Sequence, residues 1–387
     1  MKIATLNKIA DCGLDILKNR NYDIADDIAG ADGVLVRSAA MHELDLPQSL
    51  KAIARAGAGV NNIPIDKCSE QGVVVFNTPG ANANAVKELV ICGLLLASRK
   101  VIPAIDWAKT LKGNGAEVGK MVEKGKSAFA GPEIAGKKLG VIGLGAIGIL
   151  VANAATDLGM QVYGYDPYLS VDAAWKLSRA VKHAADMEEI FNQCDYITVH
   201  VPLTAATREF INTESIGKMK DGVRILNFAR GDLVRSADII DALANGKVAS
   251  YITDFPSDDL LGVEGVVAIP HLGASTQESE DNCAVMAARE IIDFLENGNI
   301  CNSVNLPNVQ MPRSATTRVC VIHRNIPNML AQISAAVSAE NINIEKMSNQ
   351  SKGDYAYTLL DVDGSVTGAA IDSIQAIDGI IRVRVID

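Results

Sequence analysis

Short apolar runs alternate with helical patterns along the first hundred residues. Four of these runs are typical of strands, at residues 3–5, 33–36, 52–54 and 73–76. Helical patterns cover residues 14–18, 65–70 and 84–98, and this alternation predicts a parallel sheet with helical crossovers. The polar, glycine-rich stretch at residues 102–134 is expected to be a surface loop or hinge.

The same alternation is stronger between residues 137 and 274. Candidate strands lie at residues 138–142, 161–165, 196–200, 224–227, 250–253 and 266–269, with helical patterns between them. Strands connected in this way predict a second doubly wound, Rossmann-like sheet. Another long helix is expected over residues 281–296.

The C-terminal part of the chain follows a different order. Residues 306–316 contain two prolines among polar residues and are expected to be a linker. From residue 317 to residue 387 the pattern is strand, helix, strand, strand, helix, strand, which predicts a βαββαβ ferredoxin-like unit. No constellation in this unit looks catalytic, which favours a role in oligomerisation or regulation.

Composition disfavours several classes of partner. The 387 residues predict two or three domains, and 48% hydrophobic residues supply a sizeable core. Lys and Arg number 36 against 46 Asp and Glu, and the net charge of −10 disfavours nucleic acid and membrane surfaces as main partners. Seven cysteines without C-x-x-C spacing are typical of reduced thiols in a cytoplasmic protein, and no metal site is expected.

A glycine-rich turn follows the strand expected at residues 138–142. Gly143, Gly145 and Gly148 form G-x-G-x-x-G at the start of a helix, and Asp166 ends the next strand. In dinucleotide folds such glycines permit a tight turn, the approach of a pyrophosphate and close helix packing. Asp166 would accept hydrogen bonds from a ribose and repel a 2′-phosphate, so the pattern predicts NAD rather than NADP. The alternative is that the glycines serve packing alone.

Two of the five histidines, His200 and His271, follow apolar strands of this unit. Doubly wound sheets bind ligands at the carboxyl ends of their strands. His271 lies in a turn of small residues that leaves room for a ligand, so it is the favoured functional histidine. His200 is the alternative, and otherwise it would be a hydrogen-bonded turn residue.

Charged residues follow two further strands of the same unit. Arg230 could clamp a carboxylate bidentately, or it could form a surface salt bridge. Any of three carboxylates after the next strand could orient His271: Asp254, Asp258 and Asp259. The alternative is that these loop carboxylates are simply solvated.

Six segments in this order resemble the D-isomer-specific 2-hydroxyacid dehydrogenases. They are VRS at 36–38, RAGAGVNN at 55–62, NTPG at 77–80, GVIGLGAIG at 140–148, NFARG at 227–231 and PHLGAST at 270–276. The resemblance covers nearly the whole chain. It implies a discontinuous substrate-binding domain, residues 1–95 and 275–305, around an NAD-binding Rossmann domain at residues 96–274.

The resemblance also implies roles for single residues. Arg230 would bind the carboxylate and the C2 oxygen of the substrate, and His271 would be the general base for the 2-hydroxyl. The substrate would be faced by Arg37, Ser38, Arg55, Gly57, Ala58, Gly59 and Asn82, with both arginines supplying charge for a phosphate. Ala146 and Ile147 would meet the pyrophosphate of NAD, Asp254 its carboxamide, and Val201, Phe228, Ala229, Gly273 and Ala274 would line the rest of the cofactor site.

Some positions depart from the family pattern. The catalytic Glu of the family aligns with Asp259, which is one methylene shorter, so the role could instead fall to Asp258 or Glu264. Ala58 and Val201 each lack a polar group that the family often has, and each lost hydrogen bond is worth about 1 kcal/mol. Asn61 stands where the family usually has Asp.

The C-terminal unit at residues 317–387 resembles an ACT domain, a small-molecule-sensing module. His323, Asn325 and Asn343 match positions that bind L-serine in serine-inhibited members of the family. Asn328 departs from the glycine usual at the start of the first ACT helix. The alternative is a paired structural module, and the resemblance implies a homodimer or homotetramer in either case.

The activity implied by the resemblance is NAD-dependent oxidation of 3-phospho-D-glycerate to 3-phosphohydroxypyruvate, the first step of phosphorylated L-serine biosynthesis. One alternative is another D-2-hydroxyacid dehydrogenase, such as a glyoxylate or hydroxypyruvate reductase. A more remote alternative is a non-enzymatic, NAD-sensing regulator.

Overall fold

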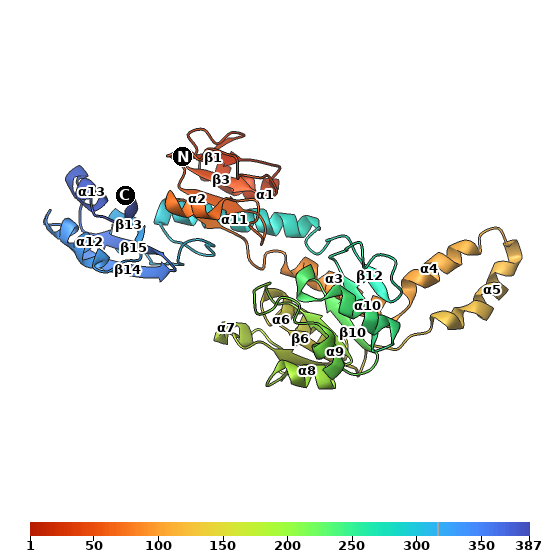
Figure 1. The fold of residues 1–387 in the computed structure, drawn as a ribbon. Helices are drawn as coiled ribbons and strands as arrows, with labels where there is room; N and C mark the ends of the chain where they lie inside the picture. The colour runs from red at the N-terminus through yellow and green to blue at the C-terminus, as the bar shows by residue number, and fades with distance from the viewer. Residues whose placement is uncertain (316) are drawn as a thin grey trace. The chain divides into compact units, whose positions relative to one another are not determined.

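The computed structural model describes residues 1–315 and 317–387 (Figure 1). The expected linker at residues 306–316 therefore ends at a residue outside the described part. The chain forms two compact units, one of residues 1–82 with 277–387 and one of residues 83–276. The prediction of two parallel Rossmann-like sheets and a smaller C-terminal sheet is confirmed.

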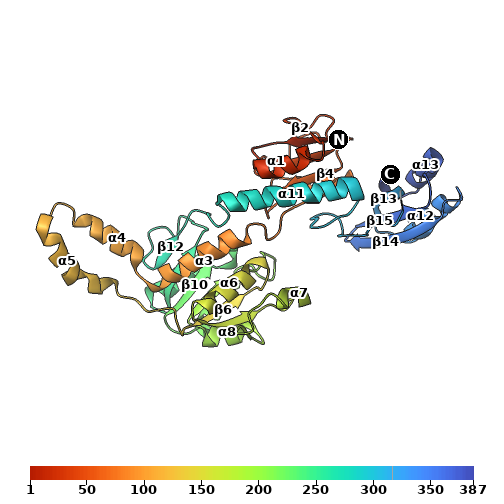
Figure 2. The ribbon, with the colours of Figure 1, turned by 180° about the vertical axis from the view of Figure 1, so that it is seen from behind.

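The first unit begins with a parallel sheet. Within residues 1–82 its strands are β1 (Lys2–Thr5), β2 (Asp23–Ala25), β3 (Gly33–Val36), β4 (Ala52–Arg55) and β5 (Val74–Phe76), in the order β2-β1-β3-β4-β5. The short helices are α1 (Asp11–Lys18) and α2 (Ile65–Glu70), and the long helix α11 (Gln277–Asn297) packs on α1 and β4. Figure 2 shows α11 from behind, running along this sheet. The inner strand β3 and the strand β5 are buried throughout, which explains their continuous apolar sequences, whereas the edge strand β2 is partly exposed.

The second unit is a doubly wound parallel sheet. Within residues 83–276 its strands are β6 (Lys138–Ile142), β7 (Gln161–Tyr165), β8 (Lys182–His183), β9 (Tyr196–Val199), β10 (Val223–Asn227), β11 (Val248–Thr253) and β12 (Val266–Ala268). Their order is β12-β11-β10-β9-β6-β7-β8. Strands are therefore added in one direction from β6 to β8 and in the other direction from β9 to β12, and the strand order reverses between β6 and β9. Ligands of such sheets bind outside the strand ends at this switch point.

Helices cover both faces of the second sheet. The apolar core on one face includes α3 (Ala83–Ser98) and α6 (Ala146–Asp157). The core on the other face includes α8 (Met187–Gln193), α9 (Thr213–Lys218) and α10 (Ser236–Ala244). We expected α3 to belong mostly to the substrate-binding domain, but it lies in the second unit because Val90 and Leu94 pack with the core under α6.

The expectation of a loop at residues 102–134 is wrong. This stretch contains α4 (Val101–Thr110), the 3-10 turns η1 (Gly115–Glu117) and η2 (Lys126–Phe129), and α5 (Val118–Gly125), and it projects from the sheet of its unit (Figure 1). Trp107 packs on Phe129, with ring centroids 5.3 Å apart, and also lies against Gly125. The two helices therefore contact each other and not the core of the sheet, although each carries apolar residues at helical spacing.

The C-terminal residues form the expected βαββαβ unit. Its elements are β13 (Thr317–Arg324), α12 (Met329–Ser338), β14 (Ile344–Lys352), β15 (Tyr355–Val362), α13 (Gly368–Gln375) and β16 (Ile380–Ile386), and the antiparallel order within residues 317–387 is β14-β15-β13-β16. One face of this sheet is covered by α12 and α13 through Val321, Ile333 and Ile374. Asn328 immediately precedes α12 and adopts φ +68°, a left-handed conformation that Asn tolerates better than most residues, which explains why it can stand where glycine is usual.

The other face of the C-terminal sheet packs into the core of the first unit. Ile322 and Tyr357 share a hydrophobic cluster with Phe294 of α11. Three side chains of this sheet also donate to carbonyls at the end of α11: Arg384 to Phe294 and Leu295, Arg318 to Asn297, and Tyr357 to Gly298. The last carbonyls of a helix lack partners within it, and positive charge is favourable there. The C-terminal sheet thus completes the first unit.

Candidate active site

The glycine-rich turn after β6 has the geometry of a dinucleotide site. Gly143 adopts φ +93°, and a Cβ there would lie 2.6 Å from the His200 carbonyl oxygen. A Cβ on Gly148 would lie 1.9 Å from the Gly143 carbonyl oxygen, so α6 packs too closely for any side chain. Around Gly145, by contrast, the described residues other than its two chain neighbours place no atom within 4 Å of the position that a Cβ would take, so its surface is open. An open backbone at a helix N-terminus suits a pyrophosphate.

Asp166 is fixed beside this turn. Its carboxylate accepts hydrogen bonds from the backbone N–H groups of Leu144 and Tyr168, each over 2.9 Å. Each carboxylate oxygen keeps a further lone pair for a ribose hydroxyl. Ala146 and Ile147 begin α6 next to the turn, and Val201 covers Gly143 from the other side. These residues fit the adenosine, ribose and pyrophosphate parts of NAD.

His271 follows β12 at the carboxyl edge of the same sheet. Its backbone N–H donates to the Asp254 carbonyl oxygen over 3.0 Å, and its ring packs against Phe255 with centroids 4.8 Å apart. The imidazole is solvent-exposed, so a ligand can reach it.

Asp254 is a buried carboxylate whose own backbone carbonyl accepts from the His271 N–H. It is 2% exposed, and its Oδ1 atom is buried without a hydrogen-bond partner from the described residues. Burial raises the pKa of Asp254, and the charges of His271 and Arg230 together with the Gly273 N–H oppose this effect. Asp254 therefore lies in the electrostatic field of both residues expected to act on substrate, and within the described residues it forms no ion pair with either.

Arg230 follows β10 and lies at the same edge. The buried Asn227 holds its turn, because the Asn227 amide donates to the Arg230 carbonyl over 2.8 Å and accepts from the Ala229 N–H over 3.2 Å. The guanidinium is exposed, and within residues 1–315 and 317–387 it forms no ion pair. The alternative of a surface salt bridge is therefore not met. The neighbouring Phe228 is buried against Gly93 of α3.

Asp259 is not placed against His271. It is exposed and accepts a hydrogen bond from the Ser257 hydroxyl, which lowers the pKa of its carboxyl. Asp258 and Glu264 are also exposed, and neither forms a hydrogen bond or an ion pair with His271 in the described part of the chain. The short Asp259 side chain is held by its own loop, which is the physical reason that the expected pair does not form.

The His200 ring is enclosed by the protein and is not open to a ligand. Its Nε2 atom lies 2.9 Å from the Thr198 hydroxyl, and its Nδ1 atom is buried without a partner among the described residues. Burial lowers the pKa of His200 to about 4, so the ring is neutral at physiological pH. A neutral, enclosed imidazole agrees with the alternative of a hydrogen-bonded turn residue.

In the first unit, two arginines lie side by side at the ends of β3 and β4. The Arg55 Nε atom donates to the Arg37 carbonyl oxygen over 3.0 Å. The Arg55 guanidinium is half-buried, burial lowers its pKa, and no carboxylate in the described residues pairs with it. Gly57 adopts φ +156°, and a Cβ there would lie 2.5 Å from Arg55 Nη1, so glycine leaves room for the guanidinium. A half-buried cation beside a glycine turn is a candidate anion site.

Sequence reasoning missed Asn7, which organises the loop that carries Arg37. Its Oδ1 atom accepts from three consecutive backbone N–H groups, of Arg37, Ser38 and Ala39, and its Nδ2 donates to the Ser38 hydroxyl over 2.7 Å. The only sequence signal is an amide side chain shortly after the first strand. In the neighbouring turn, Asn77 donates to the Ala58 carbonyl over 2.6 Å.

Other substrate residues lie near these turns. Gly59 borders the Arg55 guanidinium, with a Cβ position 3.7 Å from Nη1. Asn82 is half-buried and is the last residue of the first segment of the unit. In the second unit, Gly273 is buried against Asp254, and Ala274 follows it in the same turn.

The expected serine site is not assembled within one chain. His323 is 2% exposed, and both ring nitrogens are bonded inside the protein, to the Arg324 carbonyl and the Thr358 hydroxyl. Asn325 contacts Gly353 at the turn between β14 and β15, whereas Asn343 precedes the opposite end of β14. The length of the ladder separates the two amides, so one amino acid cannot reach both.

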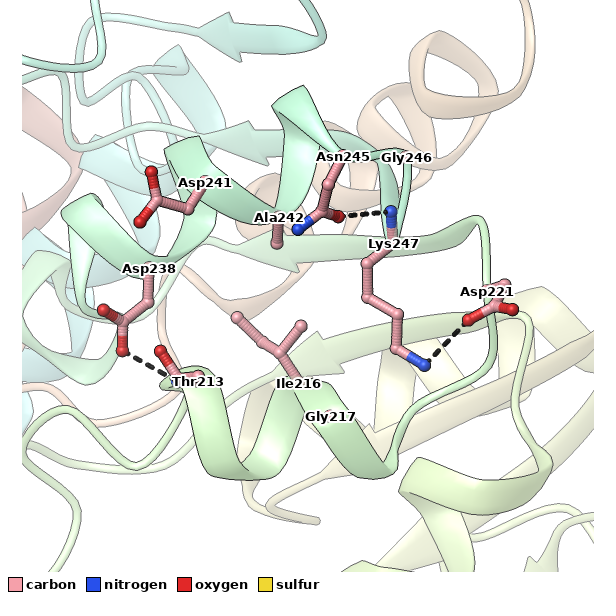
Figure 3. A pocket seen from close by; sticks show the side chains of 10 residues that line it. All are labelled: Thr213, Ile216, Gly217, Asp221, Asp238, Asp241, Ala242, Asn245, Gly246 and Lys247. Atoms are coloured by element: carbon pink, nitrogen blue, oxygen red, sulfur yellow. Dashed lines mark hydrogen bonds and ion pairs between the residues drawn. The ribbon is translucent and has the colours of Figure 1, made fainter.

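A surface pocket lies elsewhere in the second unit, between α9 and α10 (Figure 3). Its volume is about 730 Å³, and its charged groups are largely engaged: Lys247 with Asp221 over 2.9 Å and Asp238 with the Thr213 N–H over 2.7 Å. None of the candidate cofactor and substrate residues is among the ten described residues that line it. Within residues 1–315 and 317–387, no cluster of His, Cys, Asp and Glu could hold a metal ion, and no helix is long and apolar enough to cross a membrane.

Comparison with known proteins agrees with this geometry. Residues 93–273 match the NAD binding domain of the D-isomer specific 2-hydroxyacid dehydrogenases. The chain is 32% identical over 340 residues to D-3-phosphoglycerate dehydrogenase of Haemophilus influenzae, covering 85% of this chain and 79% of that protein. The same enzyme of Escherichia coli is 32% identical over 358 residues, covering 89% and 83%. This chain belongs to the D-isomer specific 2-hydroxyacid dehydrogenase family.

Other family members show the range of the match. D-3-phosphoglycerate dehydrogenase of Bacillus subtilis is 35% identical over 303 residues, which cover 76% of this chain. The chain spans only about half the length of this relative, 55%. Among solved structures, an NAD⁺-bound 3-phosphoglycerate dehydrogenase of Entamoeba histolytica is 29% identical with a TM-score of 0.61, covering 79% of this chain and 98% of that one. The resemblance inferred from the six sequence segments is thereby confirmed.

Proposed function

We propose that this protein oxidises 3-phospho-D-glycerate to 3-phosphohydroxypyruvate with NAD, the first step of phosphorylated L-serine biosynthesis. The observation that carries the proposal is the grouping of Asp254, His271 and Arg230 at the strand edge that also holds the glycine turn. D-3-phosphoglycerate dehydrogenases among the relatives support the choice of substrate.

In this mechanism the residues of the second unit handle the charge of the reaction. His271 accepts the proton of the 2-hydroxyl on an imidazole nitrogen. The buried Asp254 carboxylate stabilises the imidazolium so formed. Arg230 binds the substrate carboxylate and polarises the C2 oxygen as it becomes a carbonyl. NAD, when bound, supplies the acceptor for the hydride from C2.

The cofactor residues are assigned by the same proposal. The open backbone at Gly145 and the first N–H groups of α6 would hold the pyrophosphate. Asp166 would bind the ribose hydroxyls and repel a 2′-phosphate, which favours NAD over NADP. Gly273 and Ala274 follow His271 and would border the nicotinamide end.

The first unit supports a phosphorylated substrate. Arg55 is half-buried without a carboxylate partner in the described residues, and Arg37 is adjacent to it. Guanidinium groups bind phosphate bidentately. An unphosphorylated hydroxy acid would leave this charge unused, so the arrangement favours the phosphoglycerate reaction over a glyoxylate or hydroxypyruvate reductase.

The deciding experiment is NADH formation by the purified full chain on 3-phospho-D-glycerate, with D-glycerate in parallel. We expect turnover on the phosphorylated acid and much weaker turnover on D-glycerate. Activity on D-glycerate alone would establish a reductase-type enzyme instead. NAD binding without turnover on either acid would establish the regulator.

We further propose that two copies of the chain associate through α4 and α5. Val101, Ile102, Ile105 and Met121 in these helices are between 38% and 51% exposed, and no side chain of α4 is buried within the described residues. Apolar side chains gathered on a projecting hairpin are typical of an interface. Ile105→Asp should halve the mass measured by light scattering, and an unchanged mass would exclude this interface.

A serine effector would need two copies of the ACT domain. Antiparallel pairing of exposed β14 edges would bring the Asn325 end of one copy to the Asn343 end of the other. His323 would take no part, because its ring is enclosed. L-Serine should then inhibit turnover of the wild type and not of Asn343→Ala.

The seven free cysteines support a reducing, cytoplasmic location for this enzyme.

A further inference from the structure

Glu280 forms an ion pair with Arg37, which together with Arg55 makes up the candidate anion site of the first unit. Its Oε1 atom lies 2.7 Å from Arg37 Nη1, and the two side chains are only 38% and 39% exposed. Glu280 sits in the first turn of α11, on the helix that packs against β4. Arg55, at the end of β4, has no such carboxylate among residues 1–315 and 317–387. The Arg37 guanidinium is thus paired with a carboxylate, whereas the Arg55 guanidinium is not.

The charge at this place is therefore +1 and not +2. A phosphate monoester carries about −1.5 to −2 at neutral pH and binds best where two guanidinium groups are free. To reach both arginines, the phosphate has to displace the Glu280 carboxylate from Arg37. A hydroxy acid without a phosphate group carries no anion that could replace the Glu280 carboxylate on Arg37, so this ion pair does not affect its binding.

We propose that Glu280 is a specificity-determining residue that competes with the substrate phosphate for Arg37. Its carboxylate weakens the binding of phosphorylated acids and releases them after reaction, because it takes the phosphate's place on the guanidinium. Asn7 keeps the Arg37 loop fixed through three backbone N–H groups, so Arg37 can exchange its anion without losing its place. This inference rests on the proposed function for the identity of the substrate.

The test is Glu280→Gln in the full chain, which removes the charge and keeps the shape. We expect the KM for 3-phospho-D-glycerate to fall about fivefold, the factor that an ion pair worth about 1 kcal/mol provides. The dissociation constant of inorganic phosphate, measured by calorimetry without cofactor, should fall by a similar factor. The KM for D-glycerate should not change. A fall or no change in phosphate affinity would overturn the proposal, since a residue that merely positions Arg37 would weaken binding when altered.

Glu278→Gln is the matched control. Glu278 lies in the same helical turn and is exposed, and it forms no ion pair in the described part of the chain. The same loss of charge there should leave phosphate affinity within twofold of the wild type. An equal gain in both variants would show a general field effect and overturn a specific role for Glu280.

Arg37→Gln tests the route of the effect. In that background Glu280→Gln should no longer change phosphate affinity, because no guanidinium is left to share. A persistent change would show that Glu280 acts elsewhere and would overturn the proposal. Absence of NADH formation by the wild type would reject the proposed function alone, while the calorimetric comparison would still decide the role of Glu280.

Discussion

The backbone carbonyl of Asp254 accepts a hydrogen bond from the His271 N–H, while the Asp254 carboxylate is buried inside the fold. The His271 N–H donates to the Asp254 carbonyl over 3.0 Å, and the buried Asp254 carboxylate is influenced by the His271 charge. Asp254 thus supplies both position and charge. Asp259, which the family resemblance favoured, is turned to solvent and bonded to Ser257.

The first prediction compares these two carboxylates. Asp254→Asn should lower kcat about 10- to 1000-fold, because the neutral amide no longer stabilises the imidazolium. Asp259→Asn should change kcat less than twofold. Steady-state kinetics on both variants, with circular dichroism to verify folding, make the comparison. The reverse ranking would return the catalytic role to Asp259.

Two glycines of the turn after β6, Gly145 and Gly148, are expected to have different roles, one in NAD binding and one in the stability of the fold. Gly145→Ala should leave thermal stability nearly unchanged, because its Cβ meets open space, and should weaken NAD binding at least about tenfold, because the methyl group blocks the pyrophosphate. Gly148→Ala should destabilise the fold itself, since its Cβ would lie 1.9 Å from the Gly143 carbonyl oxygen. Thermal denaturation and NADH fluorescence titration report the two effects. Normal NAD affinity in folded Gly145→Ala would remove the pyrophosphate from this turn.

Local signals account for what could be predicted from the sequence. Apolar strands between helical patterns identify both parallel sheets, and the strand, glycine turn, helix and Asp166 lie within a short stretch of chain. The βαββαβ unit follows from the same alternation. Such features depend on residues close in sequence, so a single chain reveals them.

Long-range contacts account for what could not be predicted. The choice between Asp254 and Asp259 depends on which carboxylate is buried, and spacing after β11 does not determine burial. The amide of Asn7 binds a loop thirty residues away, at Arg37. The C-terminal sheet packs on α11 through hydrogen bonds from Arg318 and Arg384 to carbonyls at the end of that helix. No local sequence pattern predicts these contacts.

That docking leads to a prediction about stability. Arg318 and Asp361 form a bidentate ion pair with both side chains 0% exposed, and Arg318 also caps α11 at Asn297. Arg318→Leu should lower the free energy of unfolding by about 3–5 kcal/mol, because it leaves a buried carboxylate without its partner. Chemical denaturation measures the change.

An exposed ion pair provides the control for this prediction. Arg208 and Asp232 lie 2.6 Å apart with side chains 57% and 56% exposed. Arg208→Leu should therefore cost less than about 1 kcal/mol. The double variant Arg318→Leu with Asp361→Leu should regain part of the lost stability, because it removes the unpaired charge. Equal losses at the two arginines would show that the buried pair does not hold the sheet to α11.

The last prediction concerns Glu290, a buried carboxyl in the middle of α11. It is 8% exposed, accepts from the Asn302 amide over 2.7 Å, and its Oε2 has no partner among the described residues. Burial raises its pKa from 4.5 to about 8. Between these values the folded protein holds a proton that the unfolded chain releases, so the free energy of unfolding falls as pH rises. Glu290→Gln should flatten this decline between about pH 5 and 8 and stabilise the protein at pH 8, whereas Glu278→Gln should keep the wild-type slope. Denaturant titrations across this pH range make the comparison, and an unchanged slope in Glu290→Gln would show that the proton resides elsewhere.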